Sequence, residues 1–437
     1  MSEQTGVTPP LRPPSLLKDP EFLKMWSGET ISVVGSQFST VAIPILAVDV
    51  LGATSLQIGV LNALALLPFP LFGLLVGVWA DRHLKRPTMI AADLGRMLFL
   101  GLIPLSAFLF SITMNLLYLV VFAVGTLQSF FDISYQAYLP HLVRRDQLVE
   151  GNSRLTTSRS AATVVGPSLA GIATGTIGAP LAILGDVFGY LGSAAFLSRI
   201  RRPEAKPEPR QAPVLHDVRE GLQTVLKNRN LTSIALTTGT SNLFSNAFQV
   251  VSLVLLLREL GFSPFEYGVV LAFGGLGAVL ASLVVMHFIK MAGVGTVIII
   301  GAFVSGVPST LLYFANAGDA FTIAAVAFFV TLVGVEVYNV AQVSYRQALV
   351  PLELQGRMNA SMRVLVWGPI PVGALLGGVL GGLVGVREAV LISAIGGSLA
   401  FLWVFFSPVR HVKEIPERAT SQDQSSEAAP SPVVSPI

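Results

Sequence analysis

Hydrophobic residues occur along this chain in twelve long runs that are separated by shorter polar segments. Each run is about 20 residues or longer, the length that an α-helix needs to cross ~30 Å of hydrocarbon. Backbone polar groups inside a membrane must be paired within their own segment, so we expect helices rather than open strands. The predicted spans are residues 27–50, 57–80, 87–110, 115–138, 156–177, 179–198, 231–256, 266–289, 293–315, 320–344, 360–383 and 387–407.

Lysine and arginine residues fall almost entirely on every second connection between these spans. One set of connections has only Arg258 and the boundary residue Arg387 on or beside it. The other set includes Arg82, Lys85, Arg86, Arg144, Arg145, Arg199, Arg201, Arg202, Lys206, Arg210, Arg219, Lys227 and Arg229. Basic loops stay on the cytoplasmic side of a membrane. The pattern therefore predicts that both termini are cytoplasmic.

The longest polar stretch between spans divides them six and six. We expect a cytoplasmic N-terminal segment (1–25), a first six-helix bundle (26–198), a cytoplasmic linker (199–229), a second bundle (230–409) and a disordered cytoplasmic tail (410–437). The linker begins with a proline-rich stretch and continues with a short amphipathic helix that suits the membrane surface. The tail is rich in Ser, Pro, Gln and Glu, a composition that cannot bury enough apolar surface to fold.

The two halves are similar in sequence. The stretch GATSLQIGVLNA begins at Gly52, and GFSPFEYGVVLA begins 209 positions later at Gly261. SYQAYLP from Ser134 likewise resembles SYRQALVP from Ser344. Six is an even number of crossings, so both copies start on the same side and are parallel repeats. The expected fold is therefore an all-α membrane protein of two parallel-repeat six-helix bundles, an arrangement typical of alternating-access transporters.

Composition narrows the possible functions. The chain is 52% hydrophobic and 12% charged, with a mean hydropathy of +0.69, whereas soluble domains are about 25% charged. It has no cysteine, its five histidines lack metal-ligand spacing, and it contains no G-x-x-x-x-G-K-[ST] loop. We therefore expect no enzyme, cofactor, metal or ATP drive. The basic linker is better explained by anionic lipid than by nucleic acid.

Polar residues recur at helical spacing inside two equivalent spans. Glu29, Ser36 and Thr40 share one face of the first span. Asn242, Ser245 and Gln249 lie at or near the equivalent positions of the seventh. Such faces can bind a substrate between the bundles, but hydroxyl side chains also form helix–helix hydrogen bonds.

Ionisable residues deep in the other two central spans are candidate proton sites. Gln128, Asp132 and Tyr135 share a face of the fourth span, and Asp132 lies ~12 Å from its end at Pro140. The alternative for Asp132 is a structural ion pair with a basic residue on a neighbouring helix. Glu336 and Asn339 lie in the tenth span, where functional and structural roles are equally open. The order of candidates is Asp132, Glu336 and then Glu29.

The loop after the second span contains a recognisable motif. Gly77-x-x-x-Asp81-Arg82-x-x-Lys85-Arg86 resembles the signature G-x-x-x-D-R-x-G-R-R of the major facilitator superfamily, although Leu84 replaces its glycine. The resemblance implies that Asp81 latches onto a helix N-terminus of the opposite half and holds the outward-open state, with Arg82, Lys85 and Arg86 around it. Gly73 and Gly77 predict close helix packing. Asp93 and Arg96 would extend the charge network.

Further stretches resemble one branch of that superfamily. Gly166, Pro167 and Gly171 resemble the G-P-x-x-G pattern of exporters and predict a hinge in the fifth span. FLKMWSGETISVVGSQ and YLPHLVRRDQLVEGNS are similar to segments of bacterial enterobactin and macrolide exporters. Leu127-Gln128-Ser129, however, keeps only the glutamine of the R-x-x-Q-G element of proton-coupled relatives.

This resemblance implies a monomeric antiporter in the bacterial inner membrane. It would export a bulky organic compound (drug, antibiotic or siderophore-like) in exchange for protons. Uptake, or transport of a lipid-type substrate, is the alternative on the same fold. A membrane-embedded enzyme or a receptor is less favoured.

Overall fold

The structure is a computed structural model that describes residues 15–204 and 214–415. These residues contain twelve helical spans that are long and apolar enough to cross a membrane, as the hydrophobic runs predict. The first half comprises α1 (Pro20–Ile45), α2 (Ser55–Leu66), α3 (Pro68–Arg82), α4 (Lys85–Leu109), α5 (Met114–Leu142), α6 (Leu148–Ile177), α7 (Ala179–Ala182) and α8 (Leu184–Ser198). The second half comprises α9 (Val214–Lys227), α10 (Arg229–Val254), α11 (Pro264–Ala292), α12 (Val294–Val304), α13 (Ala320–Leu349), α14 (Leu352–Trp367), α15 (Pro369–Leu383), α16 (Val386–Leu399) and α17 (Leu402–Phe405).

Proline starts a new helix inside one span of each half. Pro68 begins α3 and Pro369 begins α15, so the second and eleventh spans each consist of two helices. Proline cannot continue the hydrogen-bond ladder of a preceding helix, but it fits the first helical position.

The parallel repeat is confirmed in local structure. Thr54 and Gln57 form a capping box that starts α2, and Ser263 and Glu266 form the corresponding box at α11. Each box follows a glycine with positive φ, 62° at Gly52 and 69° at Gly261, and a π-helical turn precedes each glycine. The two halves thus form the same turn with the same residue types.

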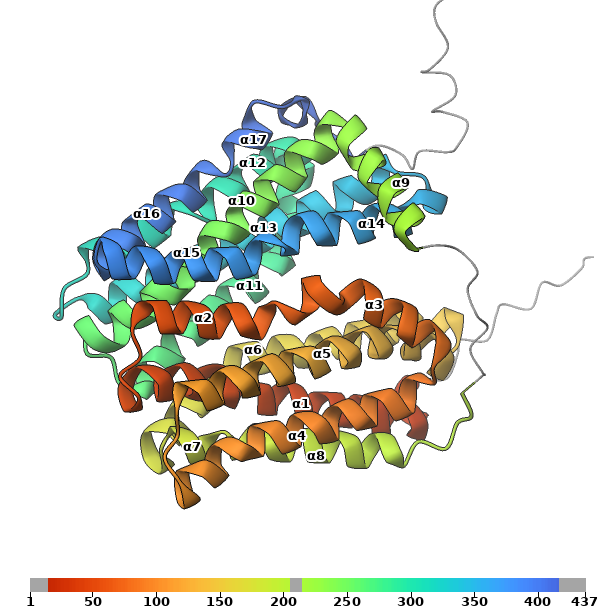
Figure 1. Ribbon diagram of the computed structural model, residues 1–437. Helices are drawn as coiled ribbons and strands as arrows, with labels where there is room; N and C mark the ends of the chain where they lie inside the picture. Colours follow the sequence, from red (N-terminus) through yellow and green to blue (C-terminus); the bar gives the residue numbers. More distant parts are fainter. Residues whose placement is uncertain (1–14, 205–213, 416–437) are drawn as a thin grey trace, which may run out of the picture.

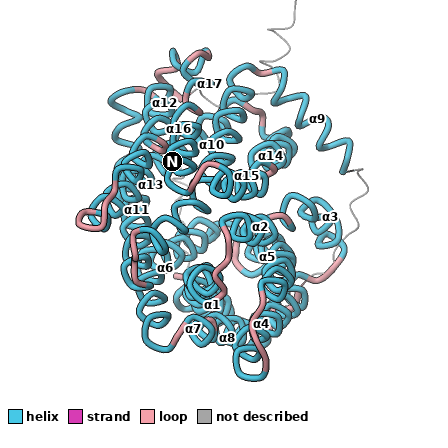
Figure 2. The backbone as a smooth tube through the Cα atoms, turned by 60° about the vertical axis from the view of Figure 1, so that its left-hand side comes forward, coloured by secondary structure: helices cyan, strands magenta, loops and turns pink. Residues whose placement is uncertain are grey.

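The two bundles meet along two helix pairs, α2 with α15 and α6 with α11 (Figure 2). Glycines permit this contact, because a Cβ atom on Gly59 would collide with the backbone of Gly378. At the ends of these pairs, the Arg258 Nη2 atom donates a hydrogen bond to the carbonyl oxygen of Val48 across the interface (3.0 Å). The bundles are therefore joined at the end that carries residues 51–54 and 260–263, called here the closed end.

The opposite end, which carries the connection 83–84 and the start of the linker, is called here the basic end. There α3 and α14 lie on either side of the space between the bundles (Figure 1). A cavity of about 300 Å³ lies between α3, α5 and α14. The rings of Phe69 and Trp367 meet 4.4 Å apart at its wall, and Arg363 of α14 donates a long hydrogen bond to Gln136 of α5 (3.4 Å). Among the described residues, only side chains bridge the bundles at this cavity, whereas backbones pack directly at the closed end.

The close packing expected at Gly73 and Gly77 is not present. A Cβ atom on Gly77 would meet nothing within 4 Å, and one on Gly73 would meet only the ring of Phe69 in its own helix. Gly73 instead lines the cavity between α3 and α14. The expectation was wrong for this conformation because the bundles are apart where these glycines lie.

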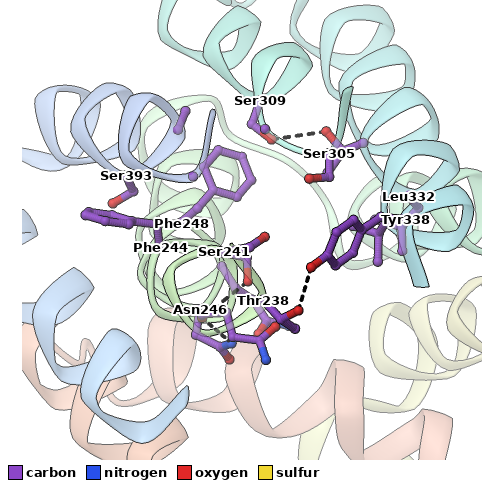
Figure 3. Close-up of a pocket in the computed structure, with 18 of the residues that line it drawn as sticks. Thr238, Ser241, Phe244, Asn246, Phe248, Ser305, Ser309, Leu332, Tyr338 and Ser393 are labelled. Atoms are coloured by element: carbon purple, nitrogen blue, oxygen red, sulfur yellow. Dashed lines mark hydrogen bonds between the residues drawn. The ribbon is translucent and has the colours of Figure 1, made fainter. Parts of the chain in front are cut away.

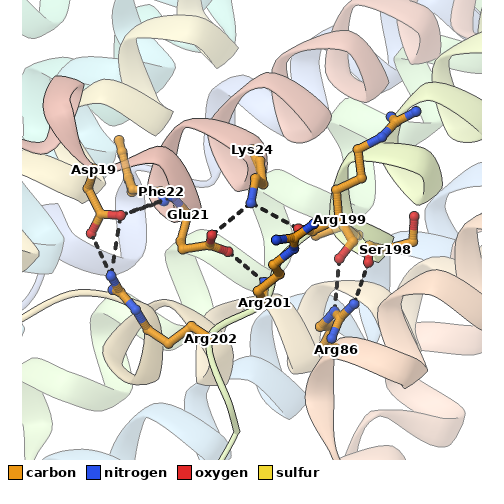
Figure 4. Close-up of polar contacts among 10 residues, drawn as sticks. Asp19, Glu21, Phe22, Lys24, Arg86, Ser198, Arg199, Arg201 and Arg202 are labelled. Carbon is orange, nitrogen blue, oxygen red and sulfur yellow. Dashed lines mark hydrogen bonds and ion pairs between the residues drawn. The ribbon is translucent and has the colours of Figure 1, made fainter.

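The start of the predicted linker is bound to the first helix (Figure 4). Arg202 pairs with Asp19, the N-cap of α1 (3.0 Å), and the Arg201 amide donates to Glu21 (2.7 Å). The Lys24 Nζ atom donates to the carbonyl of Arg199 (2.9 Å). The linker therefore leaves the first bundle from a fixed point.

The tail that we expected to be disordered from residue 410 is ordered at its beginning. The amides of Val294 and Gly295, at the start of α12, donate to the carbonyls of Lys413 and Val412. A helix start leaves amides without partners, and this segment supplies the acceptors. Other predictions for 1–14, 205–213 and 416–437 lie outside the described residues.

Candidate functional site

A cavity of about 390 Å³, with apolar walls and several polar groups, lies between the two bundles toward the closed end. Ser36 and Thr40 of α1 and Gln128 of α5 line it from the first half, and Gln249 of α10 lines it from the second. The Ser36 and Thr40 hydroxyls donate to carbonyls one turn back in α1 (2.9 and 2.8 Å). Their oxygens remain free to accept a hydrogen bond from a bound molecule.

A second cavity of about 270 Å³ lies inside the C-terminal bundle, between α10, α13 and α16 (Figure 3). Four residues singled out in the sequence line it: Asn242, Ser245, Gln249 and Asn339. The Tyr338 hydroxyl is 2.6 Å from Thr238 Oγ1 and crosses one side of the cavity. Because Gln249 borders both cavities, they are adjacent.

A buried chain of charged and amide groups runs from α4 to α5. Arg96 contacts Asp93 on its own helix and Gln128 on α5, and both partners accept hydrogen bonds from its guanidinium group. The Gln128 amide in turn donates to Asp132 Oδ1 (2.9 Å). Gln128 thus lines the cavity and also bonds to Asp132, the first candidate for proton binding.

Aromatic rings enclose the guanidinium group of Arg96. Its carbon lies 4.3 Å from the ring centre of Phe131 and 4.2 Å from that of Tyr190. Cation–π contacts of this kind are worth about 2 kcal/mol when desolvated. Arg96 and Asp93 are buried inside the first bundle, and among the described residues neither bonds to the loop 81–86. The expectation that they extend the loop network was therefore wrong.

Glu29 is buried in an ion pair that the sequence did not predict. Arg159 of α6 donates to its Oε1 atom (2.7 Å). The same guanidinium group lies 5.2 Å from the ring centre of Tyr135, which stacks on Phe131. The sequence signal for this pair was Arg159 itself, because it lies inside the predicted span 156–177. Tyr135 is buried beside the network and does not line either cavity.

Asp132 and Glu336 differ in their surroundings. Asp132 is half-buried and lies within the electrostatic influence of Arg96, Arg159 and Arg363. Glu336 is half-buried, and no described residue gives it a hydrogen bond or an ion pair. It borders neither cavity.

Among the described residues, the loop 81–86 bonds to its own half alone. The amides of Lys85 and Arg86 donate to the carboxylate of Glu204 (2.6 and 3.1 Å), and the Arg86 side chain donates to the carbonyls at the end of α8 (2.9 and 2.5 Å). Asp81 is exposed and has no hydrogen bond or ion pair with the described residues. No such bond is found for the Arg82 side chain within the described ranges either.

The Gly-Pro segment of α6 packs tightly on the other half. Its helix continues through Pro167 without interruption. A Cβ atom on Gly171 would collide with the backbone of Pro264, and Gly268 lies against the carbonyl of Pro167. Gly166 lies against the side chain of Gln37. The segment therefore forms part of the closed end.

Comparison with known proteins places this geometry in context. The family described as transmembrane secretion effectors matches residues 12–435. Macrolide efflux protein A of Streptococcus pyogenes is 24% identical over 222 residues, which are 49% of this chain and 54% of that protein. The Enterococcus faecalis protein of the same name is 25% identical over 182 residues, 40% of this chain and 55% of the relative. The chain thus spans about half the length of the curated relatives it matches.

Solved structures share the whole architecture. A bacterial homologue of the iron transporter ferroportin, in an inward-facing state, has a TM-score of 0.71 at 16% identity and covers 90% of this chain and 100% of its own. The nucleoside transporter NupG has a TM-score of 0.68 at 12% identity, with 88% of this chain and 99% of that chain covered. At these identities the likeness establishes the fold, which is the major facilitator fold expected from the sequence.

Proposed function

This chain belongs to the family of transmembrane secretion effectors, and from that premise we propose that it exports a bulky organic compound by alternating access. The observation that carries the proposal is a cavity with hydroxyl and amide groups in its wall, between two like bundles that pack closely at one end and enclose a further cavity between α3 and α14 toward the other. A site open to one side at a time is what alternating access requires.

The positive-inside rule supports a direction for the opening. The basic end would face the cytoplasm, so both chain termini would be cytoplasmic in a bacterial inner membrane. The structure then corresponds to the state that loads substrate from inside. The free carboxylate of Asp81 agrees with this assignment, because a latch that holds the outward-open state must be released here.

We propose that the proton gradient drives transport through protonation of Asp132. Its carboxylate accepts from Gln128, and Gln128 also lines the cavity and accepts from Arg96. Protonation of Asp132 removes an acceptor charge and frees the Gln128 amide to turn toward the cavity. A difference in proton affinity between the two states is what couples the gradient to the conformational change.

The cavity walls suggest the class of cargo. Hydroxyl and amide groups line both cavities, and Gln249 borders both. Aromatic rings also line each of them, Phe244 and Phe248 in one and Tyr190 and Tyr267 in the other. Such walls suit a large amphipathic molecule with several hydrogen-bonding groups. Macrolides, which the similar efflux proteins are named for, belong to that class.

Transport into everted membrane vesicles tests this function. Vesicles that contain the chain should accumulate a radiolabelled macrolide or another panel compound when their lumen is acidified, and vesicles without it should not. Accumulation only when the gradient is reversed would favour uptake, the alternative on this fold. Failure of every antibiotic, dye and siderophore, with movement of a fluorescent lipid, would favour lipid-type transport.

Enlarging Gly268 should open the closed end. The side chain in Gly268→Leu must displace the backbone of Pro167, and overpacking costs about 1–3 kcal/mol, which changes a conformational ratio at least about fivefold. The chain has no cysteine, so Ala47→Cys, at a fully buried position of the closed end, provides a unique label site. In the Gly268→Leu background, this cysteine should react with an impermeant thiol reagent at least about fivefold faster.

Gly101→Leu is the matched control, because a Cβ atom on Gly101 meets nothing within 4 Å. Labelling of Ala47→Cys should be unchanged in that background. Equal labelling rates in the Gly268→Leu and Gly101→Leu backgrounds would mean that the α6–α11 contact does not hold the closed end together.

A further inference from the structure

A large groove on the outside of the C-terminal bundle serves neither cavity. It has a volume of about 860 Å³ and lies between α9, α10, α16 and α17. Its walls are mostly apolar, and five of the apolar side chains are exposed: Leu226, Leu236, Leu399, Trp403 and Phe406. Phe244, packed against Gly396, separates it from the cavity inside the bundle.

Two cations mark one end of the groove. Lys227 ends α9 and Arg229 begins α10, so both lie at the basic end. Both are exposed, and neither forms an ion pair with any described residue. The other described residues that line the groove are uncharged, so no carboxylate there opposes this pair.

Tertiary contacts fix α9, and with it the position of Lys227. Glu220 pairs with Arg357 of α14 (2.6 Å), and Gly221 lies directly against the α14 backbone. On the opposite wall, Trp403 Nε1 donates to Thr240 of α10 (3.2 Å), which holds the indole across the groove. The groove is therefore framed by helices that are tied to one another.

The length of the groove matches one leaflet. From Arg229 to Phe244 the wall of α10 extends about 22 Å, at ~1.5 Å per residue. A leaflet contributes about half of the ~30 Å hydrocarbon core, and the headgroup region lies beyond it. An occupant with an anionic head at the cations and an acyl chain along the wall would fit.

We propose that this groove is a binding site for an anionic phospholipid from the leaflet at the basic end. Lys227 and Arg229 bind the phosphate, and the acyl chain lies against Leu236, Leu399 and Phe406. Basic pockets between helices are suited to anionic headgroups. The inference does not depend on the transported compound or on the direction of transport.

Quenching by brominated lipids tests the site on the purified full-length chain in detergent. The chain has four tryptophans, and the difference between wild type and Trp403→Phe isolates the groove signal. Phosphatidylglycerol brominated on its acyl chains should quench that signal at much lower concentrations than brominated phosphatidylcholine. Inorganic phosphate should not compete at the same concentration, because it lacks the chain.

Charge variants identify the headgroup contact. Each basic residue near a membrane surface contributes about a fivefold preference for anionic lipid, so Lys227→Gln with Arg229→Gln should raise the half-quenching concentration of phosphatidylglycerol about 25-fold. Arg145→Gln with Lys290→Gln removes two charges from the same end outside the groove and should leave it unchanged.

Three results would overturn the proposal: equal quenching by the two lipids in wild type, competition by phosphate alone, or equal effects of the two double variants. The comparison of lipids in wild type needs no variant, so it stands even if a double variant folds poorly. Equal quenching would indicate that the groove admits any amphiphile, including a transported compound.

Discussion

Asp132→Asn is expected to abolish uphill efflux while exchange down a substrate gradient continues. Asparagine keeps the size of the side chain and can still bond to Gln128, but it cannot carry a proton or a charge. Loss of the coupled proton removes the drive without removing the cavity, so uphill accumulation should fall by at least about tenfold, equivalent to ~1.4 kcal/mol of lost coupling. Everted vesicles with an acid lumen measure the first activity, and counterflow without a proton gradient measures the second.

Two further variants make this result specific. Asp146→Asn removes a carboxylate that is exposed at the basic end and paired with Arg144, and it should transport normally. Glu336→Gln tests the second candidate in the same assay. If Asp132→Asn accumulates substrate as wild type does and Glu336→Gln does not, the proton site belongs on α13.

Removing the guanidinium group of Arg96 should destabilise the protein more than any other single change in the first bundle. Arg96→Met leaves Asp93 buried without its ion-pair partner and Gln128 without its donor. Breaking a buried ion pair from one side costs about 3–5 kcal/mol. The midpoint of thermal unfolding of the purified protein, followed by intrinsic fluorescence, should fall sharply.

A double variant separates the charge from the packing. With Asp93→Asn added to Arg96→Met, no uncompensated charge remains, and replacing both members of a buried pair is often neutral. The midpoint should recover most of the loss. Arg154→Met, which breaks the half-exposed pair with Glu150 on α6, should cost no more than about 1 kcal/mol. Additive losses in the Asp93–Arg96 double variant would show that the pair is not energetically coupled.

The helix-level prediction held because its signals are local. A run of about 20 apolar residues has few alternatives to a spanning helix. The repeat was visible for the same reason, since Thr54 with Gln57 and Ser263 with Glu266 are short-range caps that each half encodes separately. The polar faces of α1 and α10 also follow from helical spacing, and the structure places Ser36, Thr40 and Gln249 together at one cavity.

The partners of the buried charges did not follow from spacing. Glu29 and Arg159 are 130 positions apart, and Arg96 reaches Gln128 across 32. Arg96 was expected to interact with the loop after α3 because it is near that loop in the chain, whereas helix packing directs it into the bundle. Gly73 and Gly77 were expected to pack closely, but the contact they could make depends on which end of the molecule is closed.

By itself, then, the sequence determined the number of apolar spans and the polar residues available to a central site. These properties depend on how each segment partitions between water and lipid, which its own composition decides. Only the tertiary structure decided which acid pairs with which arginine, where the cavities and the outer groove lie, and which end is joined. Those outcomes depend on contacts between helices far apart in the chain, such as Gly59 with Gly378, whose geometry no local pattern contains.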